Sequence, residues 1–428
     1  MMKAKQITVA IVGSGPSGFF AAEALLESGR NVEIDIIERL PLPFGLIRFG
    51  VAPDHQTTKK VTETYAAIAE SPVVRFFGNV TVGIDVQFDE LRRLYDAVIV
   101  ATGAPEDAPW VVPGRHLYGV YGCAAFVGWY NGHPDHASLT PSFESESVAI
   151  IGMGNVALDI VRILAKSPAE LEVTDITEYA LTALKSSNVR DIYLIGRRGP
   201  LETRFSNPEL REIGALQGAT RVVDPYVLAS ARQNEGAASR HQQKNLRVLE
   251  EFCREPKATG KKIHFLFNAT TESILGETSV RGITLRHGDG HQIQLDCGMV
   301  VGAIGFRSRP IPGLPFDQGR KVVPNENGRV ADSLYVVGWI KRGPSGVIGT
   351  SKPDAAEAAR AILQGLPNGG AKPGRSQLVA LLERQRVRWI DFEGWKLIDR
   401  LERRNARPGA PRQKFYRVAE IMAHAQVE

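Results

Sequence analysis

The segment ITVAIVGSGPSGFFAAEALLESGRNVEIDIIE, Ile7 to Glu38, combines the signals of a strand, a glycine-rich turn, a helix and a second strand. Val9 to Val12 is short, apolar and β-branched, which predicts a buried strand. Helical composition follows from Ser17 to Ser28, and Gly29 ends the helix. Val32 to Ile37 alternates as a second strand. The segment therefore predicts a β–α–β unit.

The turn in this unit has the spacing Gly13-x-Gly15-x-x-Gly18. Gly13 allows the tight turn, Gly15 lets a pyrophosphate approach the backbone, and Gly18 lets the helix pack close to the strand. The pyrophosphate is expected on the free N–H groups and positive dipole end of the helix. Glu38, about twenty residues past Gly18, can accept hydrogen bonds from a ribose hydroxyl. A glycine-rich turn without a ligand is the alternative, but strand, helix and terminal acid together favour a dinucleotide site.

A second fingerprint, SVAIIGMGNVALDIVRILA, begins at Ser147. Its strand leads into Gly152-x-Gly154-x-x-Ala157, and a helix is expected to about Lys166. Alanine in the third place still allows close packing of helix and strand. The sequence therefore predicts a second dinucleotide site.

The strand after this helix, Asp191 to Ile195, ends in GRRGP and not in an acid. Arg197 and Arg198 stand where an acid would otherwise select a free 2′-hydroxyl. Two cations there can pair with a 2′-phosphate through charge-assisted hydrogen bonds. The second nucleotide is therefore expected to be NADP(H) rather than NAD(H), the alternative being two solvated arginines.

Two further segments carry polar candidates. The apolar stretch Arg39 to Lys60 has three prolines and two glycines in its first fifteen residues, which predicts a loop without regular structure that lies on a cofactor or merely covers the core. His55, just before a helix expected over Thr57 to Ala69, is a polar candidate near a redox centre. Glu209, in the first turn of a helix capped by Asn207 or Ser206, is a candidate for a nicotinamide pocket, although a glutamate there also stabilises the helix dipole.

The remaining apolar segments predict further strands and one helix start. We expect a β-hairpin around an Asp-Gly turn within Ile263 to Leu295. Gly346, Val347 and Ile348 are expected to open a helix whose backbone N–H groups can face flavin carbonyls. The other segments are strands within Tyr95–Gly103, Met299–Gly305 and Ser333–Trp339, and a packing segment between domains at Gly119–Asp135.

Length and composition bound the class of protein. With 428 residues, 43% hydrophobic and 23% charged, the chain predicts two or three globular domains. No apolar run is long enough to span a membrane, and the first strand begins so early that we expect no signal peptide and a cytoplasmic protein. Cys123, Cys253 and Cys297 are scattered, which excludes a cysteine-ligated iron–sulfur cluster and a redox dithiol. No residue is assigned to a metal.

The net charge of +5 predicts attraction to an acidic partner. No dense basic tract or nucleic-acid motif is present, so we expect no nucleic acid. Arg240, Lys244 and Arg247 fall on one helical face. This stripe is either a solvated face or a docking face for an acidic protein.

Several segments together resemble adrenodoxin reductase and its bacterial relatives, the adrenodoxin-reductase-type ferredoxin–NADP+ reductases. They are PLPFGLIRFGVAPDHQTTK, AFVGWYNGHPD, GMGNVALDIVRIL, IGRRGP, ELRE and VGWIKRGPSGVIGTSKPDA. The resemblance covers nearly the whole chain and implies an α/β fold with two Rossmann-like dinucleotide-binding domains, as in glutathione reductase without its dithiol. A discontinuous FAD-binding domain is implied for about 1–104 and 333–428, with an NADP-binding domain at 105–332.

The resemblance also implies site residues. FAD would be held by the glycine loop with Ser17, and by Glu38, Leu46, Val82, Trp339, Gly346, Val347 and Ile348. NADP would be held by Met153, Gly154, Asn155, Val156, Arg197, Arg198, Glu209 and Gly346. His55 and Glu209 match a polar pair near flavin and nicotinamide, and the basic helix matches the region that receives an acidic iron–sulfur partner.

The implied function is an FAD-dependent enzyme that accepts hydride from NADPH at flavin N5 and releases electrons singly to a [2Fe–2S] ferredoxin. Other NADPH-dependent flavoproteins are the rivals: a thioredoxin-reductase-like enzyme, disfavoured by the missing CxxC, a flavin monooxygenase or a diaphorase-like enzyme. From another class, the chain could be a non-catalytic flavoprotein subunit or NADP sensor, which the complete pair of nucleotide sites disfavours.

Overall fold

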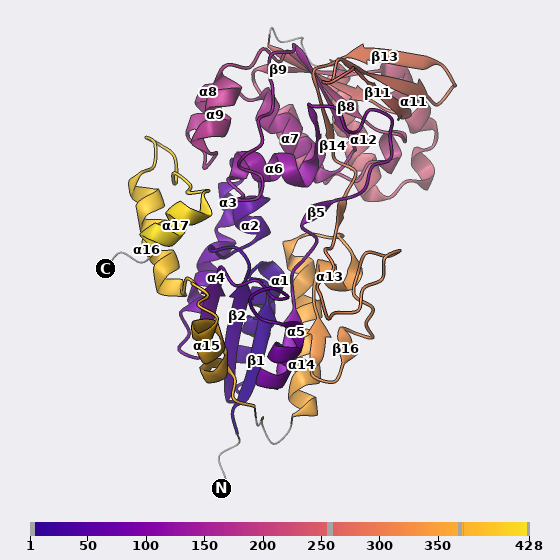
Figure 1. Ribbon diagram of the computed structural model, residues 1–428. Coiled ribbons are helices and arrows are strands. Elements are labelled where there is room, and N and C mark those ends of the chain that lie inside the picture. Colours follow the sequence, from indigo (N-terminus) through magenta and orange to yellow (C-terminus); the bar gives the residue numbers. More distant parts are fainter. Residues whose placement is uncertain (1–4, 255–259, 367–369, 371, 426–428) are drawn as a thin grey trace.

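The computed structural model describes residues 5–254, 260–366, 370 and 372–425 (Figure 1). Two six-stranded sheets organise these residues, one in each half of the molecule. A three-stranded sheet lies at the outer end of the second half, and a two-stranded ribbon lies between the halves.

The first sheet has the strand order β16-β17-β4-β1-β2-β3. Every pairing is parallel except that between β16 and β17. The carboxyl ends of the parallel strands therefore share one edge, where ligands of open α/β sheets bind. The bounds are β1 (Ile7–Val12), β2 (Val32–Glu38), β3 (Val74–Gly78), β4 (Ala97–Val100), β16 (Arg329–Ala331) and β17 (Leu334–Val336).

Side-chain alternation along β1 divides the core of this half between the two faces of the sheet. Val9 and Ile11 pack with the cluster on α1 and α14, while Ala10 and Val12 pack with the cluster on α5 and α15. Helices cover both faces, as expected for a doubly wound fold. They are α1 (Pro16–Leu26), α4 (Val61–Ala69), α5 (Phe88–Leu94), α13 (Trp339–Arg342), α14 (Ser351–Gly365), α15 (Arg375–Arg384), α16 (Phe392–Arg404) and α17 (Val418–His424).

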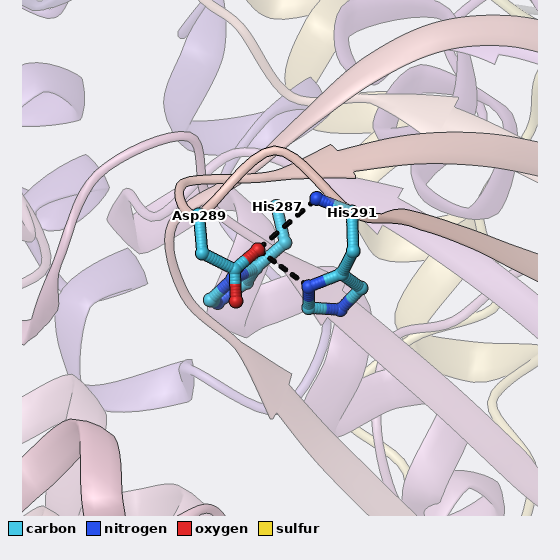
Figure 2. A group of neighbouring side chains, drawn as sticks. All are labelled: His287, Asp289 and His291. Atoms are coloured by element: carbon cyan, nitrogen blue, oxygen red, sulfur yellow. Dashed lines mark hydrogen bonds and ion pairs between the residues drawn. The ribbon is translucent and has the colours of Figure 1, made fainter.

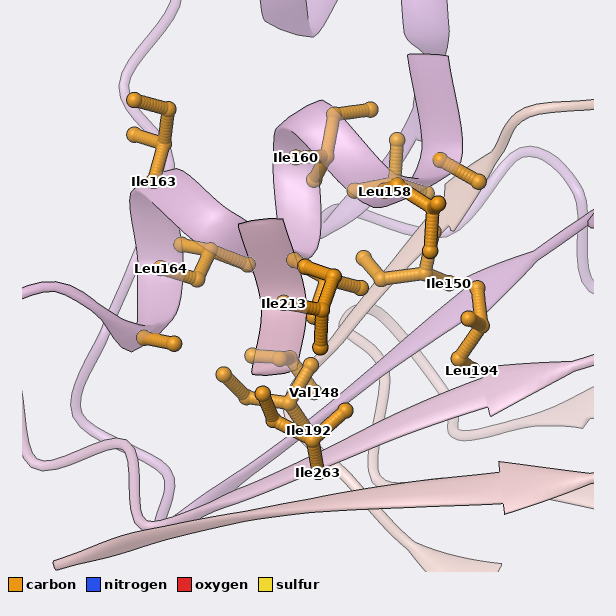
Figure 3. Close-up of a cluster of buried hydrophobic side chains, with 14 of the residues drawn as sticks. Val148, Ile150, Leu158, Ile160, Ile163, Leu164, Ile192, Leu194, Ile213 and Ile263 are labelled. Atoms are coloured by element: carbon orange, nitrogen blue, oxygen red, sulfur yellow. The ribbon is translucent and has the colours of Figure 1, made fainter. Parts of the chain in front are cut away.

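The second sheet has the order β6-β14-β7-β8-β10-β9, and all its pairings are parallel. Apolar side chains of β7, β8 and β10 meet those of α7 and α10 (Figure 3). The bounds are β6 (Val120–Gly122), β7 (Ser147–Ile151), β8 (Asp191–Ile195), β9 (Ala219–Val223), β10 (Lys261–Leu266) and β14 (Met299–Gly302). The helices are α6 (Cys123–Asn131), α7 (Asn155–Ala165), α8 (Pro168–Glu172), α9 (Glu178–Lys185), α10 (Asn207–Gly214), α11 (Pro225–Gln233) and α12 (Arg240–Arg254).

The predicted hairpin over Ile263 to Leu295 is only partly present. Its first strand, β10, pairs in parallel with β8 and β9 in the large sheet. The rest forms the antiparallel sheet of β11 (Ala269–Leu275), β12 (Gly282–His287) and β13 (Gln292–Asp296). The predicted hairpin around an Asp-Gly turn is confirmed, because β12 and β13 pair antiparallel on either side of Asp289 and Gly290. Its extension back to Ile263 was wrong, because an apolar run does not reveal which sheet will receive it.

The loop Arg39 to Lys60 is ordered and carries two short helices, α2 (Leu46–Phe49) and α3 (Gln56–Lys59), so the expectation of no regular structure was wrong. Its apolar side chains Leu42, Phe44 and Ile47 are buried. Phe49 contacts His133, just beyond α6, with ring centroids 5.1 Å apart. The α6 segment thus packs between the halves, as predicted.

The chain crosses between the halves through two short antiparallel strands, β5 (Glu106–Asp107) and β15 (Phe306–Arg307). After β15 it rejoins the first half at once: Leu314 and Val323 belong to the core beside the first sheet, and β16 pairs with β17. The return therefore comes before the expected boundary at residue 333. In the described part of the chain, no helix has the length and apolar character needed to cross a membrane.

Candidate active site

The first glycine loop has the close contacts that its spacing predicts. Gly13 has φ +109°, and a Cβ there would stand 2.7 Å from the carbonyl oxygen of Ala101. A Cβ on Gly18 would stand 2.1 Å from the carbonyl oxygen of Gly13, so only glycine lets α1 pack this close to β1. Gly15 is different, because no heavy atom of the described residues beyond its chain neighbours lies within 4 Å of its Cβ position. The loop is therefore packed against backbone atoms at Gly13 and Gly18 and is open at Gly15.

The N-terminus of α1 is available to an anion. Its first residue is Pro16, and no side chain of the described residues caps it. Free N–H groups and the positive end of the helix dipole therefore face the open side of Gly15. The loop fits a pyrophosphate.

Glu38 lies at the end of β2, beside this loop. Its Oε2 accepts hydrogen bonds from the backbone N (2.9 Å) and hydroxyl (2.8 Å) of Ser14, and its Oε1 accepts one from the backbone N of Leu40 (3.0 Å). These bonds hold the carboxylate in one orientation. Oε1 accepts one hydrogen bond, so its second lone pair can still accept a ribose hydroxyl.

Distant segments close around the first loop. The Cβ position of Gly45 lies 2.9 Å from Cα of Gly15, and that of Gly338 lies 2.1 Å from the hydroxyl of Ser17. Ser17 also donates a hydrogen bond of 3.0 Å to the hydroxyl of Ser351. The loop before α2 and the start of α14 are thus brought to the same edge of the sheet.

The other residues expected at FAD lie on these segments. The apolar side chains of Leu46 and Val347 are 41% and 67% exposed. Trp339 stacks on Phe306 with ring centroids 5.8 Å apart, and Gly346 has φ +83° just before Ile348. Val82 is half-buried in the turn after β3, at the edge of the sheet shared by the other loops.

The second glycine loop repeats the design of the first. Gly152 has φ +133°, and its Cβ position lies 2.1 Å from the carbonyl oxygen of Ala303. The Cβ position of Gly154 is open, and no side chain of the described residues caps α7. Ala157 is fully buried in the third place. The loop fits a second pyrophosphate.

Met153, Asn155 and Val156, which flank Gly154 in the second loop, contact neighbouring parts of this half. The carbonyl oxygen of Met153 accepts a hydrogen bond from the backbone N of Arg204 (2.8 Å). The side-chain oxygen of Asn155 accepts one from the backbone N of Ser206 (2.7 Å). Val156 is half-buried against the core of this half. These bonds tie the second loop to the segment that leads into α10.

Arg197 and Arg198 follow β8, and both side chains are exposed. Neither forms an ion pair with an acid in the described part of the chain. Because β7 and β8 are parallel neighbours, the two arginines lie at the same edge as the second loop. Two unpaired guanidinium groups there suit a phosphate.

Residues of both halves meet between the two loops. His55, from the first half, lies against the start of α10: its Nε2 is 2.7 Å from Oε2 of Glu212 and 3.7 Å from Oε2 of Glu209. The Oε2 atom of Glu209 is buried but has no hydrogen-bond partner among the described residues. Burial, followed by the charge of Asp159, raises the pKa of Glu209. A buried, unsatisfied carboxylate oxygen at this position is available to a ligand.

Arg162 on α7 holds this group of side chains together. Its guanidinium bonds Asp54 of the first half (2.7 Å) and Asp159 (2.7 Å), and its Nη1 lies 3.5 Å from Oε2 of Glu209. Burial alone would raise the pKa of Asp54, but the hydrogen bonds and positive charges of Arg162 and Lys166 together outweigh it and lower the pKa. Burial raises the pKa of Asp159 against the opposing charge of Arg162. Sequence reasoning assigned no role to Glu212, Asp159 or Arg162.

The spacing of these residues along their helices offers a sequence signal that each pair shares a helical face. Glu212 is three residues beyond Glu209 on α10, and Arg162 is three residues beyond Asp159 on α7, so each pair shares a helical face. That the two faces meet near His55 depends on how the halves pack.

The basic stripe lies on α12, as predicted. Arg240, Lys244 and Arg247 are exposed, while Asn245, Leu246 and Leu249 of the same helix are buried. No acid of the described residues forms an ion pair with the three basic side chains. The stripe is a solvated face available to a partner.

Comparison with known proteins identifies the family. The pyridine nucleotide-disulphide oxidoreductase model matches residues 7–194. NADPH-ferredoxin reductase FprA of Mycobacterium leprae is 40% identical, with 97% of each chain covered. The mitochondrial NADPH:adrenodoxin oxidoreductase of Arabidopsis thaliana is 38% identical, covering 98% of this chain and 96% of that one. The chain belongs to the adrenodoxin-reductase-type ferredoxin–NADP+ reductase family.

A solved structure, Mycobacterium tuberculosis FprA in complex with NADPH, has a TM-score of 0.95 and 37% identity, covering 99% of this chain and 100% of that chain. The expected two-domain Rossmann-type fold is thereby confirmed. At the level of the family, so are the oxidoreductase activity, the use of FAD and NADP(H), and a ferredoxin-type partner.

Proposed function

We propose that the first half binds FAD, the second half binds NADP(H), and the protein passes electrons from NADPH to a [2Fe–2S] ferredoxin. The observation that carries this proposal is the meeting of His55 with Glu209 and Glu212 between two open glycine loops. Beside the first loop, β2 ends in the acid Glu38, and beside the second loop, β8 is followed by two exposed arginines. This arrangement supports two different nucleotides with their reactive ends between the halves.

FAD, when bound, supplies the conversion from two-electron to one-electron transfer that a nicotinamide and an iron–sulfur cluster require. In the proposal, the N-terminus of α1 receives its pyrophosphate, and Glu38 accepts a ribose hydroxyl. Leu46, Val347 and Trp339 would be covered by the cofactor, which accounts for the exposure of Leu46 and Val347 in the protein alone. Val82, Gly346 and Ile348 complete the expected set.

For NADP(H), the open Gly154 and the N-terminus of α7 receive the pyrophosphate, while Arg197 and Arg198 pair with the 2′-phosphate. The unsatisfied Oε2 of Glu209 is placed to accept a hydrogen bond from the nicotinamide carboxamide. Arg162 fixes the position of Glu209 and carries the buried charge that balances Asp54 and Asp159. His55 then bridges the two halves at the point where the nucleotides meet.

The exposed stripe of α12 is the proposed docking face for the ferredoxin. Its cations would steer an acidic partner toward the second half, with a larger effect on the association rate than on the stability of the complex. We place the protein in the cytoplasm on its likeness to bacterial relatives.

Charge reversal tests the docking face. R240E/K244E/R247E should raise KM for a [2Fe–2S] ferredoxin at least about tenfold, an effect that added salt diminishes. NADPH–ferricyanide turnover should stay unchanged, because ferricyanide needs no protein docking site.

The matched control is R400E/R403E/R404E, which reverses three exposed arginines of α16. An equal rise in KM for ferredoxin in this control would assign the effect to net charge and remove α12 from the proposal. Absence of NADPH–ferredoxin turnover in flavin-loaded wild-type protein would contradict the proposed function itself.

A further inference from the structure

Two groups of three metal-ligating side chains occur in the described residues, with ligand atoms within 4.8 Å of one another. One, His55 with Glu209 and Glu212, belongs to the candidate active site. The other, His287 with Asp289 and His291, lies at the β12–β13 hairpin (Figure 2). This hairpin belongs to the three-stranded sheet at the outer end of the second half (Figure 1).

The backbone of the hairpin brings the three side chains together. The N–H of His287 donates to the carbonyl of His291 (2.9 Å), and the N–H of Gly290 donates to the carbonyl of His287 (2.9 Å). Gly290 has φ +95°, which lets three residues close the loop. The two histidines are thus opposite one another across the hairpin, so their side chains share a face. Asp289 stands at the tip between them.

The ligand atoms converge without further movement of the chain. The Oδ1 atom of Asp289 lies 3.1 Å from Nδ1 of His287 and hydrogen-bonds Nδ1 of His291. The same oxygen accepts a hydrogen bond from the backbone N of His291 (3.1 Å), which fixes its orientation. Ligand atoms of a tetrahedral zinc site are about 3.4 Å apart when each is about 2.1 Å from the metal. The contact between Oδ1 of Asp289 and Nδ1 of His287 is close to this spacing, and all three ligand atoms lie within 4.8 Å of one another.

One of these atoms lacks a hydrogen bond. Nδ1 of His287 is buried and lies in ion-pair contact with Oδ1 of Asp289 at 3.1 Å, but no described residue meets it with the geometry of a hydrogen bond. A buried polar atom without a hydrogen bond is uncommon, and coordination to a cation would satisfy it. This atom is the second observation that points to a ligand.

We propose that His287, Asp289 and His291 form a binding site for a divalent transition-metal ion of the zinc, nickel or copper type. Two imidazoles and one carboxylate suit these metals, whereas magnesium and calcium prefer oxygen ligands throughout. Three protein ligands leave a fourth position for water. The bound ion would cross-link β12 and β13 at the turn that joins them. When the ion binds, each ligating Nδ1 contributes its lone pair to the bond with the metal. A neutral imidazole then carries its proton on Nε2, and a protonated imidazole releases one proton to solvent.

The test uses Zn2+ alone as the probe and the full-length, FAD-loaded protein after chelator treatment. All variants carry Cys253→Ser, because that exposed thiol can also bind zinc. Calorimetric titration should give a site that H287A and H291A each weaken on the order of 100-fold. His116→Ala, which removes another exposed histidine, should leave the binding isotherm unchanged. Flavin absorbance and NADPH–ferricyanide turnover should match wild type in every variant, which verifies folding.

Continuous-wave electron paramagnetic resonance with Cu2+ should show two coordinated nitrogens in wild type and one in H291A. If H287A and H291A bind zinc as tightly as wild type, the proposal is overturned. If zinc binding instead disappears in Glu212→Gln, the ion belongs to the active-site cluster and the proposal is equally overturned. Neither result bears on electron transfer, so this test is independent of the proposed function.

Discussion

The two glycine loops share one backbone design but differ in the strand ends that lie beside them. Each has a first glycine pressed against a neighbouring strand end and a second glycine that is open to solvent. Beside the first loop, β2 ends in Glu38, whose carboxylate is held by three hydrogen bonds. Beside the second, β8 leads into Arg197 and Arg198, which are exposed and unpaired with acids among the described residues. In the proposed function, the loop backbone receives the pyrophosphate, and the strand end determines which nucleotide is bound.

The two β–α–β units that contain these loops also differ in the contacts of their second strands, β2 and β8. Asp35 on β2 is fully buried, receives a hydrogen bond from the hydroxyl of Tyr95 and pairs with Arg375 of α15 (2.7 Å). The corresponding position on β8 is Tyr193, two residues before the strand end, which stacks on His264. A buried ion pair with the C-terminal segment therefore holds β2, whereas a ring contact with β10 holds the equivalent position of β8.

The largest effect is expected from the third position of the first loop. Gly18→Ala places a Cβ 2.1 Å from a backbone oxygen, which the chain can relieve only by moving α1 away from β1. We expect a loss of more than about 3 kcal/mol in the free energy of unfolding and loss of bound flavin. Flavin content and thermal unfolding measure both. Ala157→Gly, the reciprocal change in the second loop, should cost only about 1 kcal/mol.

The next effect concerns the strand ends. R197A/R198A should lower kcat/KM for NADPH roughly 300-fold, because two charge-assisted hydrogen bonds are worth about 1.5–3 kcal/mol each. Turnover with NADH should change less than about threefold. Arg190→Ala, at the opposite end of β8, serves as the control. A parallel loss with both nucleotides would show that the arginines do not read the 2′-phosphate.

Asp35 should make the stability of the first half depend on pH. Burial is the main cause that raises its pKa from 3.8 to about 6. Between these values the folded protein binds more protons than the unfolded chain, so the free energy of unfolding falls as pH rises, by up to about 3 kcal/mol. Asp35→Asn should flatten this slope in denaturant titrations, and Tyr193→Phe should not. An unchanged slope in Asp35→Asn would contradict this account of Asp35.

The smallest effect is expected where the halves meet. Glu209→Ala should slow reduction of the flavin by NADPH about tenfold in stopped-flow experiments, because it removes a positioning contact and not the redox chemistry. Glu251→Gln, an exposed glutamate on α12, is the control. An unchanged rate in Glu209→Ala would remove Glu209 from the site.

Local features of the sequence were predicted well. The strands and helices that flank both glycine loops depend on neighbours in sequence, and the structure confirms them, whereas the role of the arginine pair stays a prediction. Features that depend on packing between distant segments were missed: the placement of β10 in the large sheet, the early return of the chain at Leu314, and the contacts of Arg162 with Asp54 and Glu209. His55 and Glu209 were paired through the family resemblance, because 154 positions separate them and leave no local signal.

The short helices α2 and α3 are a further case in which packing between distant segments, invisible in the local sequence, determines the structure. Prolines and glycines within Arg39 to Lys60 favour a loop. Burial of Leu42, Phe44 and Ile47 against the first half overrides that local preference. Tertiary packing, and not propensity, orders this segment.

The most direct test of the central claim, that the two loops hold different nucleotides, is anaerobic reduction of the bound flavin. Purified protein is mixed with equal concentrations of NADPH or NADH, and bleaching of the visible flavin bands is followed. If Arg197 and Arg198 bind the 2′-phosphate, bleaching should be rapid with NADPH and slow with NADH, and R197A/R198A should lose this preference. Equal rates with both nucleotides, or a colourless protein that cannot be reconstituted with FAD, would contradict the central claim.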